Sequence, residues 1–372
     1  MRLVVHKEIP SDRDVAGQWN DLLGLTERPE IFYSYEWALA QARAYRSFQP
    51  LLILGYEGDS LAGVAALATD AARHESFFLA GTTADYCDFI SRPEHRGEFI
   101  SLVLAKMQRL GTRLVALANL PADSVTAYAL KSAAAMNGYL TFSRPAYACA
   151  QVTLGSSHER QGIKQKIAGR KTLRTYLRGL SKEGPIAVEH LTSWDSIQTA
   201  LPEFVEAHVA RFAAVGRTSN LADPERQRFI EVLAELLCAK RAMVLNRLRA
   251  GDRSVAWCCG FQFAGSWLYY LPTFDVRLRQ FSPGFCLLSK IIEAACDDPE
   301  IERIDLGLGA EPYKERFATG TRQTLHVSLT TSALQRLKID ARYRTASAIK
   351  SSPRVEHYVR RLLGRSSPGA EA

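Results

Sequence analysis

The sequence has no long apolar segment. None of its stretches approaches the roughly 20 consecutive apolar residues that a helix needs to cross a bilayer. Residues 1–11 carry Arg2, His6, Lys7 and Glu8 among few apolar positions, so they lack the apolar core of a secretory signal. These absences predict a cytoplasmic protein.

The cysteines lack the spacing of a functional site. All seven are scattered, with no CxxC pair and no histidine at a distance suited to zinc. We therefore expect buried, apolar cysteines in a reducing compartment, with neither a metal site nor a cysteine nucleophile.

Length and composition indicate a folded protein with more than one domain. The 372 residues exceed what one hydrophobic core usually serves, and 47% are hydrophobic and 23% charged. We predict a first domain at 1–155, a second at 156–332, and a basic, partly flexible tail at 333–372. The net charge of +8 is concentrated in the tail, with nine Lys/Arg against three Asp/Glu, and in residues 159–183, with eight against two.

Helical and strand patterns alternate through both predicted domains, which is typical of an α/β fold. In the first domain we predict a helix capped by Ser34, a hairpin at 51–69, helices at 98–110 and 124–137, and a strand at 112–119. In the second we predict helices around 204–211 and at 224–240, then an antiparallel meander with strands at 243–249, 254–263 and 267–274. Both hairpins turn at a Gly-Asp pair, Gly58-Asp59 and Gly251-Asp252, which suggests a duplicated domain.

A helix start in the second domain has the residues of an anion site. Ser282 suits the N-cap, Pro283 suits the first helical position, and Gly284 leaves the backbone N–H groups unobstructed. Such a helix end can hold a pyrophosphate, and Arg277 and Arg279 precede it. Ser-Pro-Gly also begins many helices that bind nothing, so the motif alone leaves both interpretations open.

A glycine-rich turn follows the next predicted strand, at 301–306. It contains Asp305, Gly307, Gly309, Glu311, Tyr313 and Lys314. Ligands of open α/β sheets collect at the carboxyl ends of the strands. The turn is therefore a second candidate part of the site.

These motifs together resemble the CelD/BcsL-like acetyltransferases of the GNAT superfamily. The resemblance is carried by Arg170-Lys171-x-Leu173-Arg174, Phe204-x3-His208-x2-Arg211, Phe274-Asp275, Ser282-Pro283-Gly284 and Asp305-x-Gly307-x-Gly309-x-Glu311-x-Tyr313-Lys314. It implies tandem GNAT-like (acyl-CoA N-acyltransferase) domains, with mixed sheets flanked by helices. This sequence departs from most GNAT enzymes in the loop from Gln280 to Gly284, which is one residue longer and lacks the second glycine.

The resemblance implies transfer of an acetyl or other acyl group from acyl-CoA to an amine, without a metal. The residues that would contact the cofactor are Phe274, Arg279, Gln280, Ser282, Pro283 and Gly284. Tyr313 is the candidate acid for the leaving thiolate. The base is to be chosen among His208, Glu311 and Asp275, with His208 favoured because its unperturbed pKa is near neutrality.

Other polar residues are candidates for organising the site or meeting the substrate. Lys314 and Arg211 are each ambiguous between these roles, whereas Asp305 suits an organiser of the glycine turn. In the first domain, Asp85 lies in a polar cluster that we expect to line an acceptor cleft.

A basic helix is predicted over 164–180, with Lys166, Arg170, Arg174 and Arg178 on one face. That face is either a solvated surface or a contact for phosphates of a cofactor, a substrate or RNA.

The acceptor implied by the family is a small-molecule or sugar amine of polysaccharide or cell-envelope biosynthesis. One alternative is a FemAB-type transferase, which shares the duplicated fold and takes its acyl group from aminoacyl-tRNA, although we do not favour a nucleic-acid partner. Another is a catalytically silent GNAT-like module in a polysaccharide-synthesis complex. The basic tail, with Arg342, Arg344, Arg354, Arg360 and Arg361, would suit contact with anionic lipid at the inner membrane face.

Overall fold

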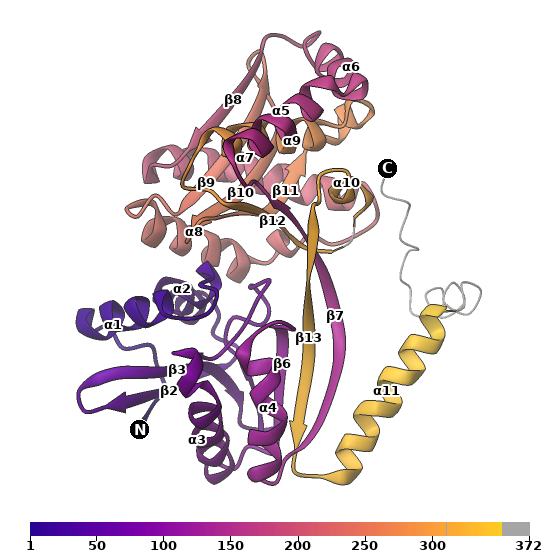
Figure 1. The fold of residues 1–372 in the computed structure, drawn as a ribbon. Coiled ribbons are helices and arrows are strands. Elements are labelled where there is room, and N and C mark those ends of the chain that lie inside the picture. The colour runs from indigo at the N-terminus through magenta and orange to yellow at the C-terminus, as the bar shows by residue number, and fades with distance from the viewer. Residues whose placement is uncertain (310, 352–372) are drawn as a thin grey trace. The chain divides into compact units, whose positions relative to one another are not determined.

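The computed structural model describes residues 1–309 and 311–351 (Figure 1). The chain divides into two compact units, and both are mixed α/β. Of the described residues, unit 1 holds 1–42, 46–147 and 323–351, and unit 2 holds 43–45, 148–309 and 311–322. Within the described residues, no helix has both the length and the hydropathy needed to span a membrane.

Unit 1 is built on an antiparallel hairpin extended by further strands. The elements before residue 138 are β1 (Arg2–His6), α1 (Arg13–Gly24), η1 (Ile31–Tyr33), α2 (Tyr35–Ala44), β2 (Gln49–Glu57), β3 (Ser60–Asp70), β4 (Glu75–Phe78), β5 (Ile90–Ser91), η2 (Pro93–His95), α3 (Arg96–Arg109), β6 (Leu114–Pro121) and α4 (Val125–Met136). The strand order is β1-β2-β3-β4-β6-β13. Trp19, Trp37 and Phe99 are fully buried in its core.

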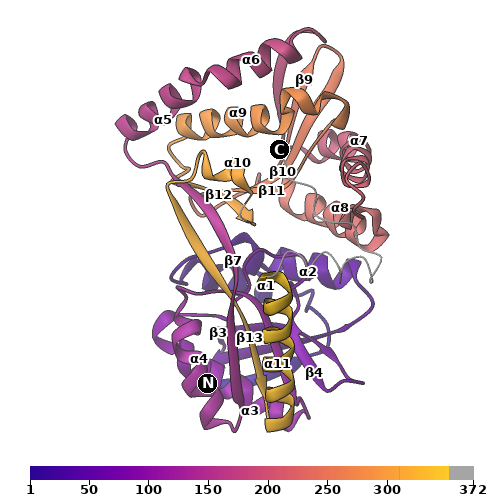
Figure 2. The ribbon, with the colours of Figure 1, turned by 90° about the vertical axis from the view of Figure 1, so that its right-hand side faces the viewer.

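Unit 2 has its sheet between two sets of helices. The elements that begin and end in unit 2 are α5 (Ser157–Gly169), α6 (Lys171–Leu180), β8 (Ile186–Leu191), α7 (Trp194–Ala213), η3 (Asn220–Ala222), α8 (Pro224–Cys238), β9 (Met243–Ala250), β10 (Arg253–Phe263), β11 (Ser266–Phe274), η4 (Val276–Phe281), α9 (Pro283–Asp297), β12 (Arg303–Leu308) and α10 (Pro312–Glu315). β7 (Leu140–Thr153) and β13 (Gly320–Thr330) each have residues in both units, and α11 (Ala333–Ser351) belongs to unit 1. The strand order is β7-β12-β11-β10-β9-β8. Figure 2 shows α5, α6 and α9 on one face and α7 and α8 on the other.

The two units repeat one topology, which confirms the predicted α/β duplication. The meander β2-β3-β4 in unit 1 corresponds to β9-β10-β11 in unit 2, and a helix then leads to a strand that pairs in parallel, β6 on β4 and β12 on β11. The hairpin glycines Gly58 and Gly251 both have a φ of 61°, a left-handed conformation that costs glycine little.

The strand that follows each parallel pair joins the sheet of the other half. β7 follows β6 in sequence but pairs antiparallel with β12, whereas β13 follows β12 and pairs antiparallel with β6. As a result, residues 323–332 of the predicted second domain belong to unit 1, as do the described residues of the predicted tail, 333–351. The first part of the predicted tail is the helix α11, and Arg354, Arg360 and Arg361 lie outside the described residues.

Local signals explain most elements. The Ser34 hydroxyl accepts a hydrogen bond from the N–H of Trp37, as expected for an N-cap, and Gly138 ends α4 with a φ of 69°. The predicted helix over 164–180 is instead two helices, because Arg170 is extended with a ψ of 110°. Lys166 therefore lies on α5, and only Arg174 and Arg178 share a face of α6.

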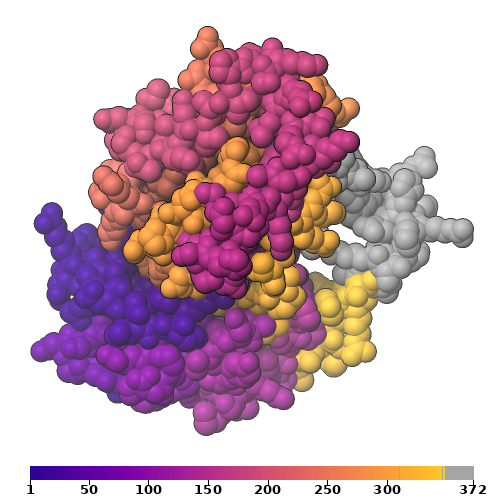
Figure 3. All heavy atoms as spheres, turned by 45° about the horizontal axis from the view of Figure 1, so that its top comes forward, coloured from indigo at the N-terminus to yellow at the C-terminus, as the bar shows by residue number. Residues whose placement is uncertain are grey.

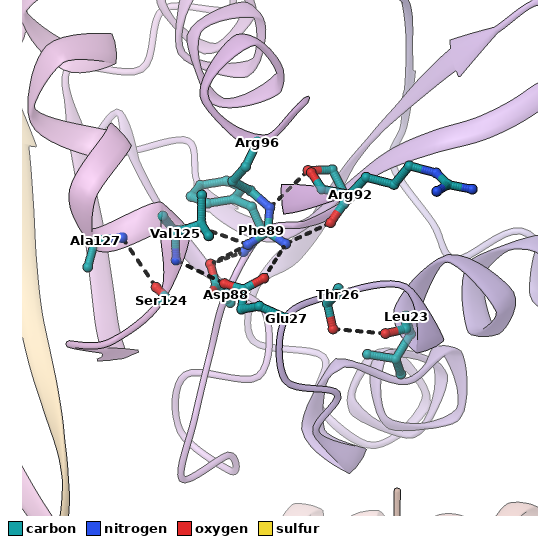
Figure 4. A network of polar contacts seen from close by, with 12 residues as sticks. Leu23, Thr26, Glu27, Asp88, Phe89, Arg92, Arg96, Ser124, Val125 and Ala127 are labelled. Carbon is teal, nitrogen blue, oxygen red and sulfur yellow. Dashed lines mark hydrogen bonds and ion pairs between the residues drawn. The ribbon is translucent and has the colours of Figure 1, made fainter. Parts of the chain in front are cut away.

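A buried ionic network fixes the start of α3 in unit 1 (Figure 4). Arg96 is only 1% exposed and donates to Ser91 O at 2.8 Å and to Glu27 at 3.2 Å, while its Nη1 lies 3.5 Å from Asp88. Burial raises the pKa of Asp88 to about 6, against the opposing effect of Arg96. The network joins the region after α1 to the segment before α3.

Candidate functional site

The two parallel strands of unit 2 separate toward their carboxyl ends. β11 pairs with β12 only from Ser266 to Leu268, although β11 continues to Phe274. The pairing of β11 with β10 is interrupted by a bulge, since Cys258 faces Pro272 and Cys259 faces Tyr270. Leu271 is the extra residue, and its φ of 46° is unusual for a side-chain-bearing residue. An opening at this end of a parallel pair is where α/β proteins bind ligands.

Arg211 holds the bulged end of β11 against α7. Its Nη1 donates to Pro272 O at 2.9 Å, and its guanidinium carbon lies 4.9 Å from the centroid of the Phe274 ring. A second bond joins the same elements, from the Thr273 hydroxyl to Ala207 O at 3.3 Å. Arg211 is therefore attached to the backbone beside the bulge.

Two tyrosines and two charged residues gather near the bulge. Tyr269 of β11 is buried, and burial raises its pKa well above the usual value. Tyr313 and Glu311 add to that increase through their charge, and Arg211 opposes it, so all three lie within electrostatic range of the Tyr269 hydroxyl. Tyr313 is half-buried and packs against the core of the unit. Tyr269 had no motif in the sequence to identify it.

Asp305 organises the irregular, glycine-containing second half of β12, where the pairing with β7 is interrupted between Asp305 and Leu308. It is 3% exposed, and its Oδ1 accepts a hydrogen bond from the N–H of Gly307 at 2.9 Å. Gly307 has a φ of 72°, which favours glycine. The Oδ2 of Asp305 accepts from Gln151 of β7 at 2.6 Å. One carboxylate oxygen thus holds the backbone at Gly307, and the other holds the side-chain amide of Gln151.

Lys314 ties the end of the turn to its beginning. Its Nζ donates to Leu308 O at 2.9 Å and lies 2.7 Å from Glu311 Oε2. The ammonium is buried, so the Glu311 carboxylate compensates its charge locally.

The start of α9 has free backbone donors. Pro283 stands at the first helical position as predicted, but Ser282 is left-handed, with a φ of 42°, and its side chain does not cap the helix. The first N–H groups of a helix have no intrahelical partner, so those of Gly284 and Phe285 are available to an anion. A Cβ on Gly284 would approach only Phe274, at 3.4 Å, so the space beside these donors is otherwise open.

Two arginines flank this helix start. Arg170 lies 5.8 Å from the Phe285 ring centroid and 4.5 Å from that of Phe317, and Arg316 lies 5.6 Å from Phe285. Burial lowers the pKa of Arg170, and repulsion from Arg316 lowers it further. Neither makes an ion pair with a carboxylate in the part of the chain that the structure describes. Sequence reasoning did not select Arg316, while the predicted Arg279 and Gln280 are exposed on η4.

His208 is buried on α7 and does not have a near-neutral pKa. The ring is 2% exposed, stacks on Phe212 at 4.8 Å, and has its Nδ1 2.7 Å from the Ser219 hydroxyl. Burial lowers its pKa to about 4, and the positive charges of Arg211 and Arg226 contribute. His208 is therefore neutral at pH 7.

Asp275 is engaged by two arginines. It accepts hydrogen bonds from Arg253 at 2.6 Å and from the side chain and N–H of Arg277 at 2.9 and 3.0 Å. Although burial acts in the opposite direction, these bonds lower the pKa of Asp275. An ion-paired carboxylate of low pKa is a weak base, so this residue is better suited to fixing the loop before α9.

Asp85 differs from the other predicted site residues in belonging to unit 1, in the segment that follows β4. All the others belong to unit 2. No group of three or more His, Cys, Asp or Glu side chains suited to a metal ion occurs among residues 1–309 and 311–351.

Comparison with known proteins identifies the type of domain. Residues 168–315 match the family model of the acetyltransferase (GNAT) domain, whereas no curated protein gives a significant match. The matched segment lies within unit 2 and is similar to a GNAT-type acetyltransferase domain, the superfamily that the sequence predicted.

Solved structures share the fold of most of the chain at low identity. FemX has 9% identity and a TM-score of 0.59, over 88% of this chain and 97% of FemX. The C-terminal domain of a putative lysylphosphatidylglycerol synthetase from Agrobacterium fabrum has 13% identity and a TM-score of 0.52, over 88% and 95%. L-PGS from Bacillus licheniformis has 11% identity and a TM-score of 0.54, over 88% and 94%. The likeness shows a shared fold.

Proposed function

We propose that unit 2 transfers an acetyl or other acyl group from acyl-CoA to an amine, on an acceptor of polysaccharide or cell-envelope biosynthesis. The observation that carries the proposal is the start of α9, where N–H groups without intrahelical partners lie beside Phe274 of β11. Arg170 and Arg316 lie over the Phe285 ring at this helix start, and neither has a carboxylate partner among the described residues. The acceptor class rests on the resemblance to CelD/BcsL-like acetyltransferases.

The residues present fit the pyrophosphate of acyl-CoA. The N–H groups of Gly284 and Phe285 would donate to its oxygens, and Arg170 and Arg316 would compensate its charge. Gly284 is suited to this role because a Cβ there would occupy the space beside the donors. When bound, acyl-CoA supplies the thioester whose carbonyl the amine attacks.

Roles for the remaining residues follow from their placement. The bulge at Leu271 frees backbone from the β10–β11 ladder, and an N–H there would polarise the thioester carbonyl. Tyr313 would donate a proton to the leaving thiolate; its charge acts on the buried Tyr269, which is also within electrostatic range of Arg211. We favour Glu311 as the base, because His208 has a pKa of about 4 and Asp275 is held by two arginines, whereas Glu311 has one cationic partner, Lys314.

Calorimetric titration with acetyl-CoA and with CoA tests the proposal. We expect saturable binding by the wild type and its loss in Gly284→Trp, whose indole would cover the helix start. Gly320→Trp is the matched control, because a Cβ there would meet nothing within 4 Å. Absence of binding by the folded wild type, or equal loss in both variants, would contradict the assignment.

Aminoacyl-tRNA is the second candidate acyl donor. The observation in its favour is the exposed basic face of α6, with Lys171, Arg174 and Arg178. Aminoacyl-tRNA would become the proposed donor if the protein failed to bind CoA but bound aminoacyl-tRNA. That binding should depend on salt and should weaken in Arg174→Gln/Arg178→Gln.

A further inference from the structure

The helix α11 packs on unit 1 by one face only. On that face, Arg336 donates to Thr141 O at 2.9 Å and lies 5.0 Å from the Phe142 ring, and Tyr343 meets the same ring at 5.7 Å. Gln335, Ile339 and Asp340 are half-buried on this side of the helix. The side of α11 that contacts β7 is thereby defined.

The opposite face of α11 has apolar residues along its centre line, in the first half of the helix. Leu334 and Leu337 are 62% and 64% exposed, and Ala341 is exposed as well. Residues three and four apart lie on one side of a helix, so these three form a continuous stripe. A single exposed apolar residue is common on protein surfaces, but two adjacent leucines exposed to this degree form a patch of the kind that marks an interaction site.

Cations border the stripe on both sides. Lys338 and Arg342 lie along one flank and Arg344 along the other, all exposed, whereas the acidic Asp340 is on the packed side and pairs with Arg344 at 3.0 Å. Lys338 and Arg342 have no ion-pair partner among the residues that the structure describes. The whole helix contains five Lys/Arg and one Asp. Figure 3 shows part of α11, in yellow, at the molecular surface.

We propose that the outer face of α11 binds the surface of an anionic lipid bilayer. An apolar stripe between rows of cations matches the boundary of such a bilayer, where leucines enter the acyl region and cations stay at the headgroups. The helix would lie in the plane of the membrane, since its five Lys/Arg and one Asp make it too polar to cross one. This contact is independent of the proposed chemistry of unit 2.

Co-sedimentation of the full chain with lipid vesicles tests the proposal. We expect binding to vesicles that contain phosphatidylglycerol, little binding to phosphatidylcholine alone, and weakening by salt. Lys338→Gln/Arg342→Gln removes two cations and lowers the partition coefficient by about 30-fold. Leu334→Gln/Leu337→Gln lowers it by about tenfold or more, because the apolar insertion is lost.

Matched variants in unit 1 are the controls. Arg109→Gln/Lys131→Gln removes the same charge from other exposed positions, and Leu110→Gln/Met136→Gln replaces apolar residues that are 50% and 72% exposed. Both should bind as the wild type does. Equal losses in these controls would overturn the proposal, as would failure of the folded wild type to bind the anionic vesicles. If the chain instead dimerised through Leu334 and Leu337 and did not bind vesicles, the outer face of α11 would be a contact with a second copy of the chain.

Discussion

Gln151 donates a 2.6 Å hydrogen bond to the carboxylate of Asp305, and so joins β7 to the end of β12. The other oxygen of Asp305 accepts from the N–H of Gly307. One buried carboxylate therefore connects β7 with the glycine-containing segment at the end of β12. Glu311, Tyr313 and Lys314 follow that segment in the sequence.

Replacement of Asp305 by Asn should destabilise the fold. An amide offers one acceptor and one donor group where two acceptors are required, so one buried donor loses its partner. We expect the free energy of unfolding to fall by about 1–3 kcal/mol, measured by urea denaturation. Asp252→Asn, at an exposed turn, should change it by less than about 0.5 kcal/mol. Equal stability of the two variants would refute the organising role.

Replacement of Tyr313 by Phe should lower turnover and leave cofactor binding nearly unchanged. A positioned general acid contributes about 10²-fold or more, so kcat should fall by that order while the Kd for acetyl-CoA stays within about twofold. Tyr128→Phe, at an exposed position of α4, is the control. An unchanged kcat would remove Tyr313 as the acid.

The burial of His208 predicts a dependence of stability on pH. Its pKa is lowered from 6.5 to about 4, so between these values the unfolded chain binds the proton and the folded chain does not. The stability contributed by neutral His208 is complete above about pH 6.5 and is lost as pH falls toward 4, by up to about 1.4 kcal/mol per pH unit. Unfolding curves of wild type and His208→Gln across this range measure the difference. A difference that does not vary with pH would show that the histidine titrates normally.

Ser282→Gly should stabilise unit 2 slightly. A left-handed non-glycine residue costs about 1–2 kcal/mol, and Ser282 makes no capping bond to offset it. After the entropy of the added glycine is subtracted, we expect a gain of about 0.5 kcal/mol. Ser124→Ala, at a cap whose hydroxyl accepts from Ala127, should cost about 1 kcal/mol. Thermal unfolding measures both, and a loss in Ser282→Gly would point to an interaction of the hydroxyl itself.

Local patterns were sufficient to predict the elements that carry the site. Leu288, Ile291, Ile292 and Ala295 recur at helical spacing in the sequence and are the buried side of α9, and the predicted meander from 243 to 274 forms. These features depend on helical spacing, turn residues and caps, which neighbouring positions in the chain specify.

Tertiary structure decided how those elements combine. The pairing of β7 with β12 and of β13 with β6 joins residues about 150 to 200 positions apart, and no local pattern encodes such a choice. The break at Arg170 places its guanidinium on Phe317 instead of along one basic helix. The pKa of His208 depends on desolvation, which follows from packing around the ring and cannot be read from the residue type.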